Sequence, residues 1–341
     1  MADTKCQVVF HPGNCLNKKK PFARQCRQCI ESCPHGAIRE DREPDAERCT
    51  NCGACMAVCP SDGLVHRIMD TLHEYLFEAD AVVLHCRSAR PDGFDVACLG
   101  ALDRDLWTTL ILLAAAKPVK VMIGECNGCD DRQACQSSLQ TLRELQKDWP
   151  GHPEIVIETG QAAVESGGKT WVKTVSRRDF ITGWRQLFRE KVNESLPGLA
   201  AGETYSVPRS REWMAKALQA QPERQIPFLA LDVQDSCTSC GVCSAVCPQG
   251  ALHKQDESGK ISLVLEPFKC VQCRRCLEIC PPKALSIAPK VISLSFLLGK
   301  VVLHAGSPSY CSRCGKQIFD TSETSLCAAC ATDDHAADFL F

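Results

Sequence analysis

The chain has 341 residues, of which 26 are cysteine. At roughly 100–200 residues per domain, this length predicts two to four domains with real cores. The formal net charge of −2, from 39 Lys and Arg against 41 Asp and Glu, argues against a nucleic-acid binder and against an acidic disordered chain. Aromatic residues make up only 6%, so we expect small cysteine-tethered units rather than one large aromatic core.

The sequence predicts neither export nor a membrane span. Residues 1–6 contain no basic segment followed by an apolar one, and the longest apolar stretch, 106–124, is interrupted by Lys117. The twin arginines at 177–178 lie far inside the chain, where we expect an ordinary helix that starts at Ser176. We therefore expect a cytoplasmic protein, in which clustered cysteines are metal ligands rather than disulfides.

The cysteines follow an internal repeat. Each half of the chain contains two runs that end in Cys-Pro, and a complete run has gaps of two, two and three residues between its four cysteines. The complete runs are Cys49, Cys52, Cys55 and Cys59; Cys237, Cys240, Cys243 and Cys247; and Cys270, Cys273, Cys276 and Cys280; the shortened run is Cys26, Cys29 and Cys33. Chance does not produce four Cys-Pro endings at this spacing.

This spacing suits iron–sulfur clusters. Such clusters are held by thiolates, and three cysteines spaced by two residues can cover one face of a cubane while the fourth, before proline, ligates the neighbouring cluster. Proline helps to turn the chain because its φ is fixed and it has no N–H. The small and aliphatic residues at 36–38, 63–65, 250–252 and 283–285 are expected to exclude water. Paired zinc knuckles are the competing interpretation, but zinc has no use for four Cys-Pro runs.

The pattern resembles two-cluster bacterial ferredoxins, twice over, across roughly residues 10–70 and 230–290. The resemblance implies 4Fe–4S clusters on three complete sets: Cys237, Cys240, Cys243 and Cys280; Cys270, Cys273, Cys276 and Cys247; and Cys49, Cys52, Cys55 and Cys33. A further set of Cys26, Cys29 and Cys59 is one ligand short. We favour Cys15 over Cys6, since it is nearer in sequence and follows a turn; without either, the site would hold a 3Fe–4S cluster or none.

The middle of the chain has a different pattern. Short apolar segments at 81–85 and 118–123 predict strands, and amphipathic segments at 103–116 and about 133–147 predict helices. Alternating strands and helices predict an α/β unit with a parallel sheet. Cysteines follow the strand ends or lie in adjoining turns, where such sheets place their ligands: Cys86, Cys98, Cys126 and Cys129.

This middle set resembles the small iron–sulfur subunit of methyl-viologen-reducing hydrogenases, with the match running from Val96 to Cys129. The resemblance implies a 2Fe–2S cluster that passes electrons to a flavin-containing heterodisulfide reductase subunit. Three alternatives stay open: a 4Fe–4S cluster, a thiol–disulfide pair at Cys126 and Cys129, or buried thiols without a cofactor. Cys135 is a spare ligand or a buried thiol, and we favour the latter; His85 is the one histidine that merits a test.

The C-terminal segment predicts a second kind of metal site. Two Cys-x2-Cys pairs fit tetrahedral zinc, or a single iron as in rubredoxin: Cys311 and Cys314, and Cys327 and Cys330. A tail of this length cannot bury a core, so we expect the metal to fold it. An unmetallated tail is the remaining alternative.

We therefore predict an α+β multi-domain protein with five parts. These are an N-terminal dicluster ferredoxin module (1–75), a central α/β iron–sulfur domain with a parallel sheet (76–160), a helical linker (161–230), a C-terminal dicluster module (231–290) and a four-cysteine, zinc-ribbon-like tail (291–341). Helices are expected at about 177–194 and 211–221 of the linker, which would dock the two ferredoxin modules together or wrap a partner. The run Lys18–Lys20 is expected to be a solvated loop, or to steer an acidic redox partner.

We see no dinucleotide fingerprint, P-loop or catalytic triad, so the first functional hypothesis is an electron-transfer subunit. By resemblance, its partners are a hydrogenase, a formate or aldehyde dehydrogenase, or a flavin-containing heterodisulfide-reductase-like subunit. The second hypothesis is a maturation factor or redox sensor for a metalloenzyme. The third, an enzyme in its own right, would need thiol chemistry at Cys126 and Cys129.

Overall fold

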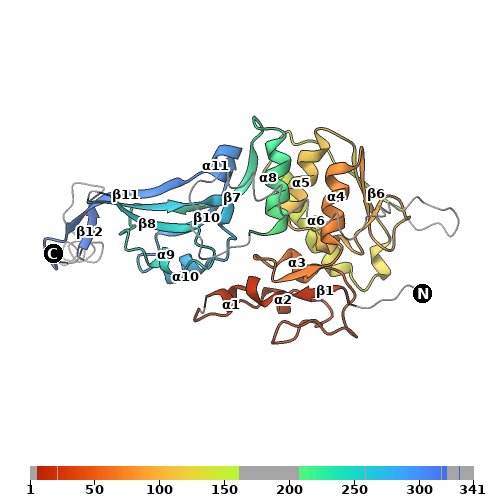
Figure 1. Cartoon of the computed structure of the whole chain (residues 1–341), viewed down its shortest axis with the longest axis horizontal. Helices are drawn as coiled ribbons and strands as arrows, with labels where there is room; N and C mark the ends of the chain where they lie inside the picture. Colours follow the sequence, from red (N-terminus) through yellow and green to blue (C-terminus); the bar gives the residue numbers. More distant parts are fainter. Residues whose placement is uncertain are drawn as a thin grey trace, which may run out of the picture.

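The computed structural model describes residues 6–20, 22–160, 207–257, 259–315, 317–320 and 330. The helix expected at 177–194 and Cys327 lie outside these residues. Figure 1 shows an elongated arrangement, with a group of helices beside a sheet toward one end and a long antiparallel sheet toward the other. Within the described ranges, no helix is long and apolar enough to cross a membrane.

The N-terminal part consists of short elements separated by cysteine-containing turns. Strand β1 (Val8–Phe10) pairs antiparallel with β2 (Leu64–His66), which follows both cysteine runs. Three one-turn helices lie between them: α1 (Leu16–Lys19), α2 (Gln28–Glu31) and α3 (Ala54–Ala57). The two strands close the module on itself.

The central domain contains the parallel sheet predicted from the alternating strands and helices. Its order is β4-β3-β5-β6, and every described pairing in it is parallel. The strands are β3 (Val82–His85), β4 (Phe94–Asp95), β5 (Val119–Ile123) and β6 (Val156–Thr159), and the helices are α4 (Met69–Glu78), α5 (Arg104–Ala114) and α6 (Arg132–Lys147). Because the strands are parallel, their carboxyl ends share one edge of the sheet.

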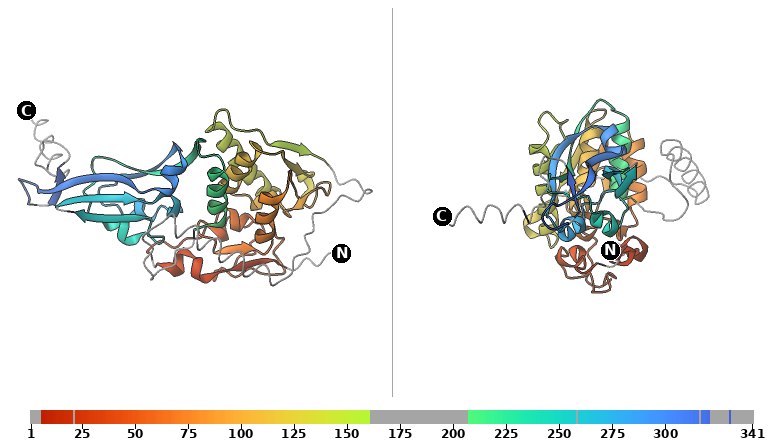
Figure 2. Two further views of the ribbon diagram at one scale, coloured as in Figure 1. Left: turned by 45° about the horizontal axis from the view of Figure 1, so that its top comes forward. Right: turned by 90° about the vertical axis from the view of Figure 1, so that its left-hand side faces the viewer.

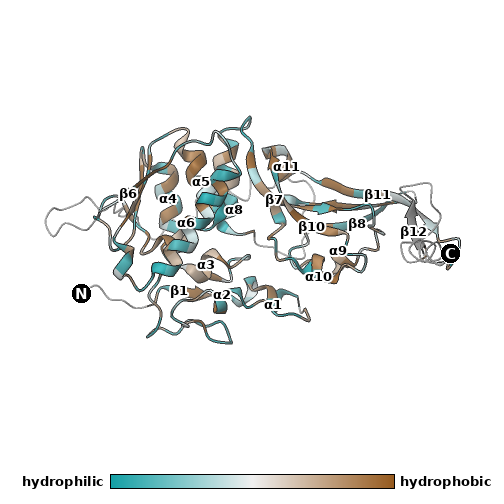
Figure 3. Ribbon diagram, turned by 180° about the vertical axis from the view of Figure 1, so that it is seen from behind, coloured by the Kyte–Doolittle hydropathy of each residue, from teal (hydrophilic) through white to brown (hydrophobic). Residues whose placement is uncertain are grey.

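Helix α5 is the most deeply buried helix of this domain, and Figure 3 shows that it is largely apolar. Asp103 caps its start by accepting a hydrogen bond of 2.7 Å from the N–H of Leu106. Trp107 is fully buried, and its Nε1 donates to Oγ of Ser138 in α6 at 2.9 Å. The two helices are thereby fixed next to the turn that contains Cys98.

Helix α8 (Arg209–Gln219), expected at 211–221 of the linker, packs against α5 and α11. Both Figure 1 and the left view of Figure 2 show α8 between the central helices and the C-terminal sheet. Its buried residues include Trp213, Met214 and Leu218, which join the hydrophobic core of the central domain. This helix therefore docks the two halves of the molecule onto each other.

The C-terminal half begins at strand β7 (Ile226–Val233), earlier than the expected boundary at 231. Strand β7 pairs antiparallel with β10 over eight residues, and a four-stranded sheet has the order β12-β11-β9-β8. Its elements are α9 (Val242–Val246), β8 (Leu252–Glu257), β9 (Lys260–Leu265), α10 (Arg275–Ile279), β10 (Leu285–Ile292), α11 (Leu294–Leu298), β11 (Val301–Tyr310) and β12 (Gln317–Asp320). Strand β11 thus joins the expected tail to the module.

The hydrophobic core does not follow the expected domain boundaries. One continuous core includes Val8 and Leu64 of the N-terminal module together with Leu76, Leu110 and many other central residues. A separate core lies in the C-terminal module, around Leu263 and other residues. The physical reason is size: a few one-turn helices and three-residue strands cannot bury a core alone, so the N-terminal module shares that of its neighbour.

Candidate metal centres

The described cysteines from Cys6 to Cys280 are free thiols. They gather in groups that we name by their order along the molecule. The first set is Cys15, Cys26, Cys29 and Cys59; the second is Cys33, Cys49, Cys52 and Cys55; the third is Cys247, Cys270, Cys273 and Cys276; the fourth is Cys237, Cys240, Cys243 and Cys280. A central set and a tail set follow below.

In the first set, the structure places Cys15 beside the other three cysteines. A Cβ on Gly63 would lie 3.4 Å from Sγ of Cys59 and 3.7 Å from Cβ of Cys15, so these side chains are neighbours. Burial raises the pKa of Cys29 to about 11, and the nearby thiolates of Cys59, Cys26 and Cys15 add to the shift. Cys15 therefore lies next to Cys29 and Cys59, where the sequence predicts the fourth ligand of this set.

The second set converges around Cys55. Burial raises the pKa of Cys55 well above its usual value, and the neighbouring thiols of Cys52, Cys33 and Cys49 add to the shift. Cys6 lies here and not at the first set, because it is hydrogen-bonded to the thiol of Cys49. The second set is thus complete without Cys6, which is a fifth thiol at its edge.

The third and fourth sets form in the same way. Burial raises the pKa of Cys276, and the thiols of Cys270, Cys273 and Cys247 contribute to that shift, as does Cys243 of the fourth set. The four cysteines of the fourth set line a single hollow. In the C-terminal module, therefore, the last cysteine of each run meets the first three cysteines of the other run.

The backbone repeats the same geometry at every Cys-Pro run. The third residue after the cysteine adopts a left-handed conformation with φ between 51° and 56° in all four runs: Gly36, Asp62, Gly250 and Lys283. The next N–H donates to the cysteine sulfur in three runs: Ala37 to Cys33 at 3.2 Å, Gly63 to Cys59 at 3.1 Å, and Ala251 to Cys247 at 3.2 Å. Left-handed turns that present N–H groups make anion-binding concavities, as iron–sulfur sites require.

The three complete runs share a second feature. Residues on either side of the second cysteine have positive φ: Asn51 and Gly53, Ser239 and Gly241, and Gln272 and Arg274. Residues of five different types adopt this unusual conformation at these positions, so it is imposed by the fold of the loop and not by the type of side chain.

The aliphatic residues expected after Cys-Pro are buried, with Ala37, Leu64, Ala251 and Ala284 each at most 2% exposed. Thiol donors, inward N–H groups and an apolar surround all fit a bound 4Fe–4S cluster.

The central set contains one cysteine more than the sequence predicts. Sγ of Cys126 lies 3.7 Å from Sγ of Cys135, which also hydrogen-bonds Cys98. Burial is the main reason why the pKa of Cys126 is raised, and the nearby Cys86 and Cys129 raise it further. Cys135, expected to be a buried thiol apart from the site, thus lies between two of the predicted ligands.

Two sequence signals could have identified Cys135. It belongs to the buried face of α6, with Ser138, Leu142 and Leu145 at helical spacing. That face turns toward the carboxyl end of the sheet, because α6 starts directly after the turn of Cys126–Cys129. His85 is also buried here; its Nδ1 lies 3.2 Å from the carbonyl oxygen of Cys86, while its Nε2 has no hydrogen-bond partner among the described residues.

The second set adjoins the central set directly. Asp131, only 4% exposed, accepts a hydrogen bond of 2.6 Å from Thr50 and lies 2.8 Å from Nε2 of His35. Burial raises the pKa of Cys52 to about 11, and the nearby Asp131 and Cys98 add to the shift. A carboxylate at the start of α6 therefore ties the second ligand loop to the central domain.

The first set adjoins the third. Nη1 of Arg275 donates to the carbonyl oxygen of Lys20 at 2.7 Å, and its Nη2 donates to Oδ1 of Asn17 at 3.3 Å. Asn17 in turn bonds both the N–H and the carbonyl oxygen of Cys26, each at 2.9 Å. Lys19 donates to Gln249 at 2.7 Å. Part of the run Lys18–Lys20 is therefore engaged at the junction between the two ferredoxin modules.

The tail set brings three of its four predicted ligands together. Ligand atoms of Cys311, Cys314 and Cys330 lie within 4.8 Å of one another, and Cys327 lies outside the described residues. The N–H of Gly315 donates to the carbonyl oxygen of Cys311 at 2.9 Å, closing a tight turn around the first pair. Thiols at this separation can share one tetrahedral ion.

Comparison with known families gives matches on both ferredoxin-like parts. A 4Fe–4S dicluster domain matches residues 236–284, and 4Fe–4S binding domains match residues 43–65 and 24–37. These ranges contain the Cys-Pro runs. The class of protein is therefore that of iron–sulfur proteins with multiple 4Fe–4S cluster-binding domains.

Three curated proteins are similar to parts of this chain. A ferredoxin of Pyrobaculum islandicum is 49% identical over 55 residues, 16% of this chain and 49% of the relative. One component of an ion-translocating oxidoreductase complex of Methanosarcina acetivorans is 48% identical over 42 residues, 11% of this chain and 16% of the relative. Pyruvate synthase subunit PorD of Methanothermobacter marburgensis is 34% identical over 65 residues, 16% of this chain and 80% of the relative. The chain thus spans half or less of the first two relatives.

The chain belongs to the 4Fe–4S ferredoxin family, because it covers most of PorD at this identity and matches the family's domains in both halves. Its family matches are 4Fe–4S cluster-binding domains. The two-module arrangement around a central α/β domain exceeds what any of these short matches covers.

Proposed function

We propose that the chain is an electron-transfer subunit that relays single electrons through four 4Fe–4S clusters and a further 2Fe–2S cluster. The first to fourth sets would hold the 4Fe–4S clusters. Four of the five central thiols would hold the 2Fe–2S cluster. When bound, such clusters would accept and release one electron at a time.

The observation that carries this proposal is that the central set and the first to fourth sets form a series in which each set adjoins the next. Cys98 of the central set is close to Cys52 of the second, and Cys55 of the second is close to Cys29 of the first. The first set meets the third through Asn17 and Arg275. The third meets the fourth where Cys276 approaches Cys243. Contacts therefore support one unbranched order: central, second, first, third, fourth.

The central set stands at one end of this order, at the carboxyl edge of the parallel sheet. Its resemblance to the small subunit of methyl-viologen-reducing hydrogenases supports a role as the port to a flavin-containing, heterodisulfide-reductase-like partner. The opposite end would serve a hydrogenase or a formate or aldehyde dehydrogenase. The relatives named as subunits of oxidoreductase complexes are consistent with such partners.

For the tail set we propose a structural zinc ion bound by Cys311, Cys314, Cys330 and Cys327. Zinc is inert to electrons, so this site would stabilise the turn at the end of β11 and not extend the relay. A single iron at the same ligands is the alternative that metal analysis distinguishes.

Metal and sulfide analysis of anaerobically purified protein tests the proposal. We expect about 16–18 iron atoms with nearly equal sulfide, and about one zinc, from these cluster types. Dithionite should reduce all clusters, and a flavoprotein acceptor should reoxidise them. Iron-free protein would refute the proposal, and slow cluster loss in air without electron exchange would favour a sensor instead.

A matched pair of variants tests the first ligand set. We expect Cys15→Ser to change the electron paramagnetic resonance (EPR) spectrum of one cluster, or to lower the iron content by up to about four atoms. Cys6→Ser should leave both unchanged, because Cys6 lies beside a set that is already complete. The reverse result would assign the fourth position to Cys6.

A further inference from the structure

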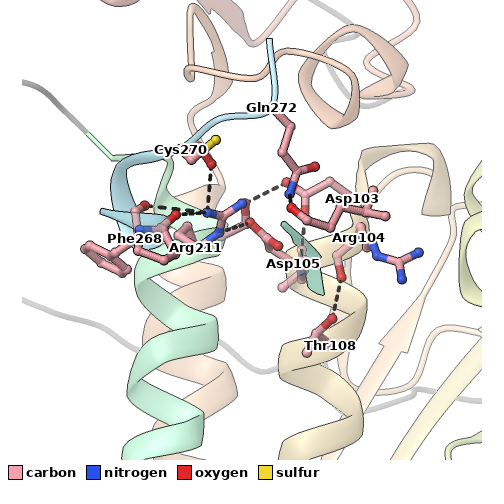
Figure 4. A network of polar contacts seen from close by, with 12 residues as sticks. Asp103, Arg104, Asp105, Thr108, Arg211, Phe268, Cys270 and Gln272 are labelled. Atoms are coloured by element: carbon pink, nitrogen blue, oxygen red, sulfur yellow. Dashed lines mark hydrogen bonds and ion pairs between the residues drawn. The ribbon is translucent and has the colours of Figure 1, made fainter. Parts of the chain in front are cut away.

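Two buried arginines face the third set. Arg275 lies between Cys273 and Cys276 in the chain, and Arg211 donates from its Nη1 to the carbonyl oxygen of Cys270 at 3.1 Å. Each residue is only 4% exposed. Figure 4 shows Arg211 reaching from α8 to the backbone around Cys270 and Phe268. Their charges cannot be screened by solvent as surface charges are.

Arg275 is unusual because its described partners are neutral. It bonds the carbonyl oxygen of Lys20 and Oδ1 of Asn17, its guanidinium lies 5.1 Å from the centre of the Phe22 ring, and no ion pair to it occurs among the described residues. A buried cation without a counter-ion is destabilising, because it loses its hydration without gaining an ionic partner. An anion held at the third set would remove that destabilisation, and a thiolate-ligated cluster is such an anion.

Arg211 forms an ion pair with Asp105, and the orientation of its guanidinium determines which end of the pair lies near the third set. Its Nε donates to Asp105 at 2.6 Å, while Nη1 points to the carbonyl oxygens around Cys270. The ion pair therefore presents its positive end to the third set. The charge beside the second set has the opposite sign, because the buried carboxylate of Asp131 lies near Cys52.

We propose that Arg275 and Arg211 raise the reduction potential of the cluster on the third set. This inference rests on the proposed function. Reduction adds one electron, and hence one negative charge, with no bond formed or broken; a fixed positive charge nearby favours that state.

The directions of the pKa shifts agree with this contrast. Burial raises the pKa of Cys273 to about 11, and Arg275 opposes the shift. Burial raises the pKa of Cys270, and Arg211 opposes it. At Cys59 of the first set, burial raises the pKa and Asp62 adds to it. Positive groups thus lie near the third set and a carboxylate lies near the second, whereas the first set has both Asp62 near Cys59 and Arg42 near Cys29.

The test is a redox titration with dithionite, followed by EPR, on the full anaerobic protein. A Cys270→Ser variant first identifies the signal of the third set. We expect Arg275→Gln to change the reduction equilibrium of that signal about tenfold toward the oxidised form, or about 59 mV for a one-electron couple. Arg275→Lys keeps the charge and should restore most of the change.

Arg24→Gln is the matched control. Arg24 also contacts α10 across this junction, through Glu278 at 3.4 Å, but its side chain is 79% exposed. Solvent screens it, so the third signal should stay within about twofold. If Arg275→Gln fails to incorporate iron, the double variant Arg211→Gln and Asp105→Asn removes the second cation with its partner and should shift the same signal in the same direction.

Clear outcomes would overturn the inference. An unchanged third signal in iron-loaded Arg275→Gln, an equal shift in Arg24→Gln, or no recovery in Arg275→Lys would each refute it while leaving the relay intact. Iron-free unmodified protein would instead refute the proposed function.

Discussion

Gly100 marks the closest approach between the central domain and the second ligand loop. A Cβ at this position would lie 2.6 Å from Cβ of Ala134 and 2.9 Å from the carbonyl oxygen of Cys52, where ordinary contacts are 3.4–4 Å. Neither neighbour is the end of a flexible side chain. Gly100→Ala must therefore move the start of α6, the loop of Cys52, or both, by roughly an ångström, as overpacked sites do.

The change in the free energy of unfolding of Gly100→Ala results from two opposing effects. Overpacking in a closely packed region destabilises by about 1–3 kcal/mol, while replacing glycine by alanine stabilises by about 0.4–1 kcal/mol through the unfolded chain. We expect a net loss of about 1–2 kcal/mol in Gly100→Ala. The spin coupling between clusters on the central and second sets should also weaken, since the two loops are pushed apart.

Urea unfolding and EPR of anaerobic protein measure both effects. Gly13→Ala is the matched control, because a Cβ there meets nothing within 4 Å and its φ is not positive. That variant should unfold like the unmodified protein or slightly later. If Gly100→Ala and Gly13→Ala unfold at the same urea concentration, with identical spin coupling, the close approach of the two loops is refuted.

Three further predictions concern separate sites. Burial, with Asp105 nearby, raises the pKa of Asp103 from 3.8 to about 7, so its stabilising contribution is complete below about pH 4 and is lost as the pH rises through about 7. The unfolding midpoint should fall over that range, less so in Asp103→Asn; equal profiles would exclude Asp103 as the cause. Cys135→Ala should alter the EPR spectrum of the central cluster, and an unchanged spectrum would make Cys135 the spare thiol of the five. Cys314→Ser should lower the zinc content by about one atom and leave the iron content unchanged, whereas a loss of iron would assign that metal to the tail.

The local features of the protein follow from its sequence alone. The spacing of each Cys-Pro run places its thiols within a single loop, and the loops recur with the same left-handed residues at Gly36, Asp62, Gly250 and Lys283. The parallel sheet could likewise be predicted, because its strands and helices alternate in the chain. These features depend on residues a few positions apart, which sequence patterns describe directly.

Which distant residues meet depends instead on tertiary packing. Cys15 rather than Cys6 joins the first set, Cys135 joins the central set, and Arg275 reaches Asn17 in the other module. The sequence does not predict which elements pack against α8, for the same reason. Amphipathic spacing shows that a helix buries one face, but it does not identify the element that covers that face. Contacts across the molecule depend on how all of its elements pack together, and that packing sets the order of the thiol sets.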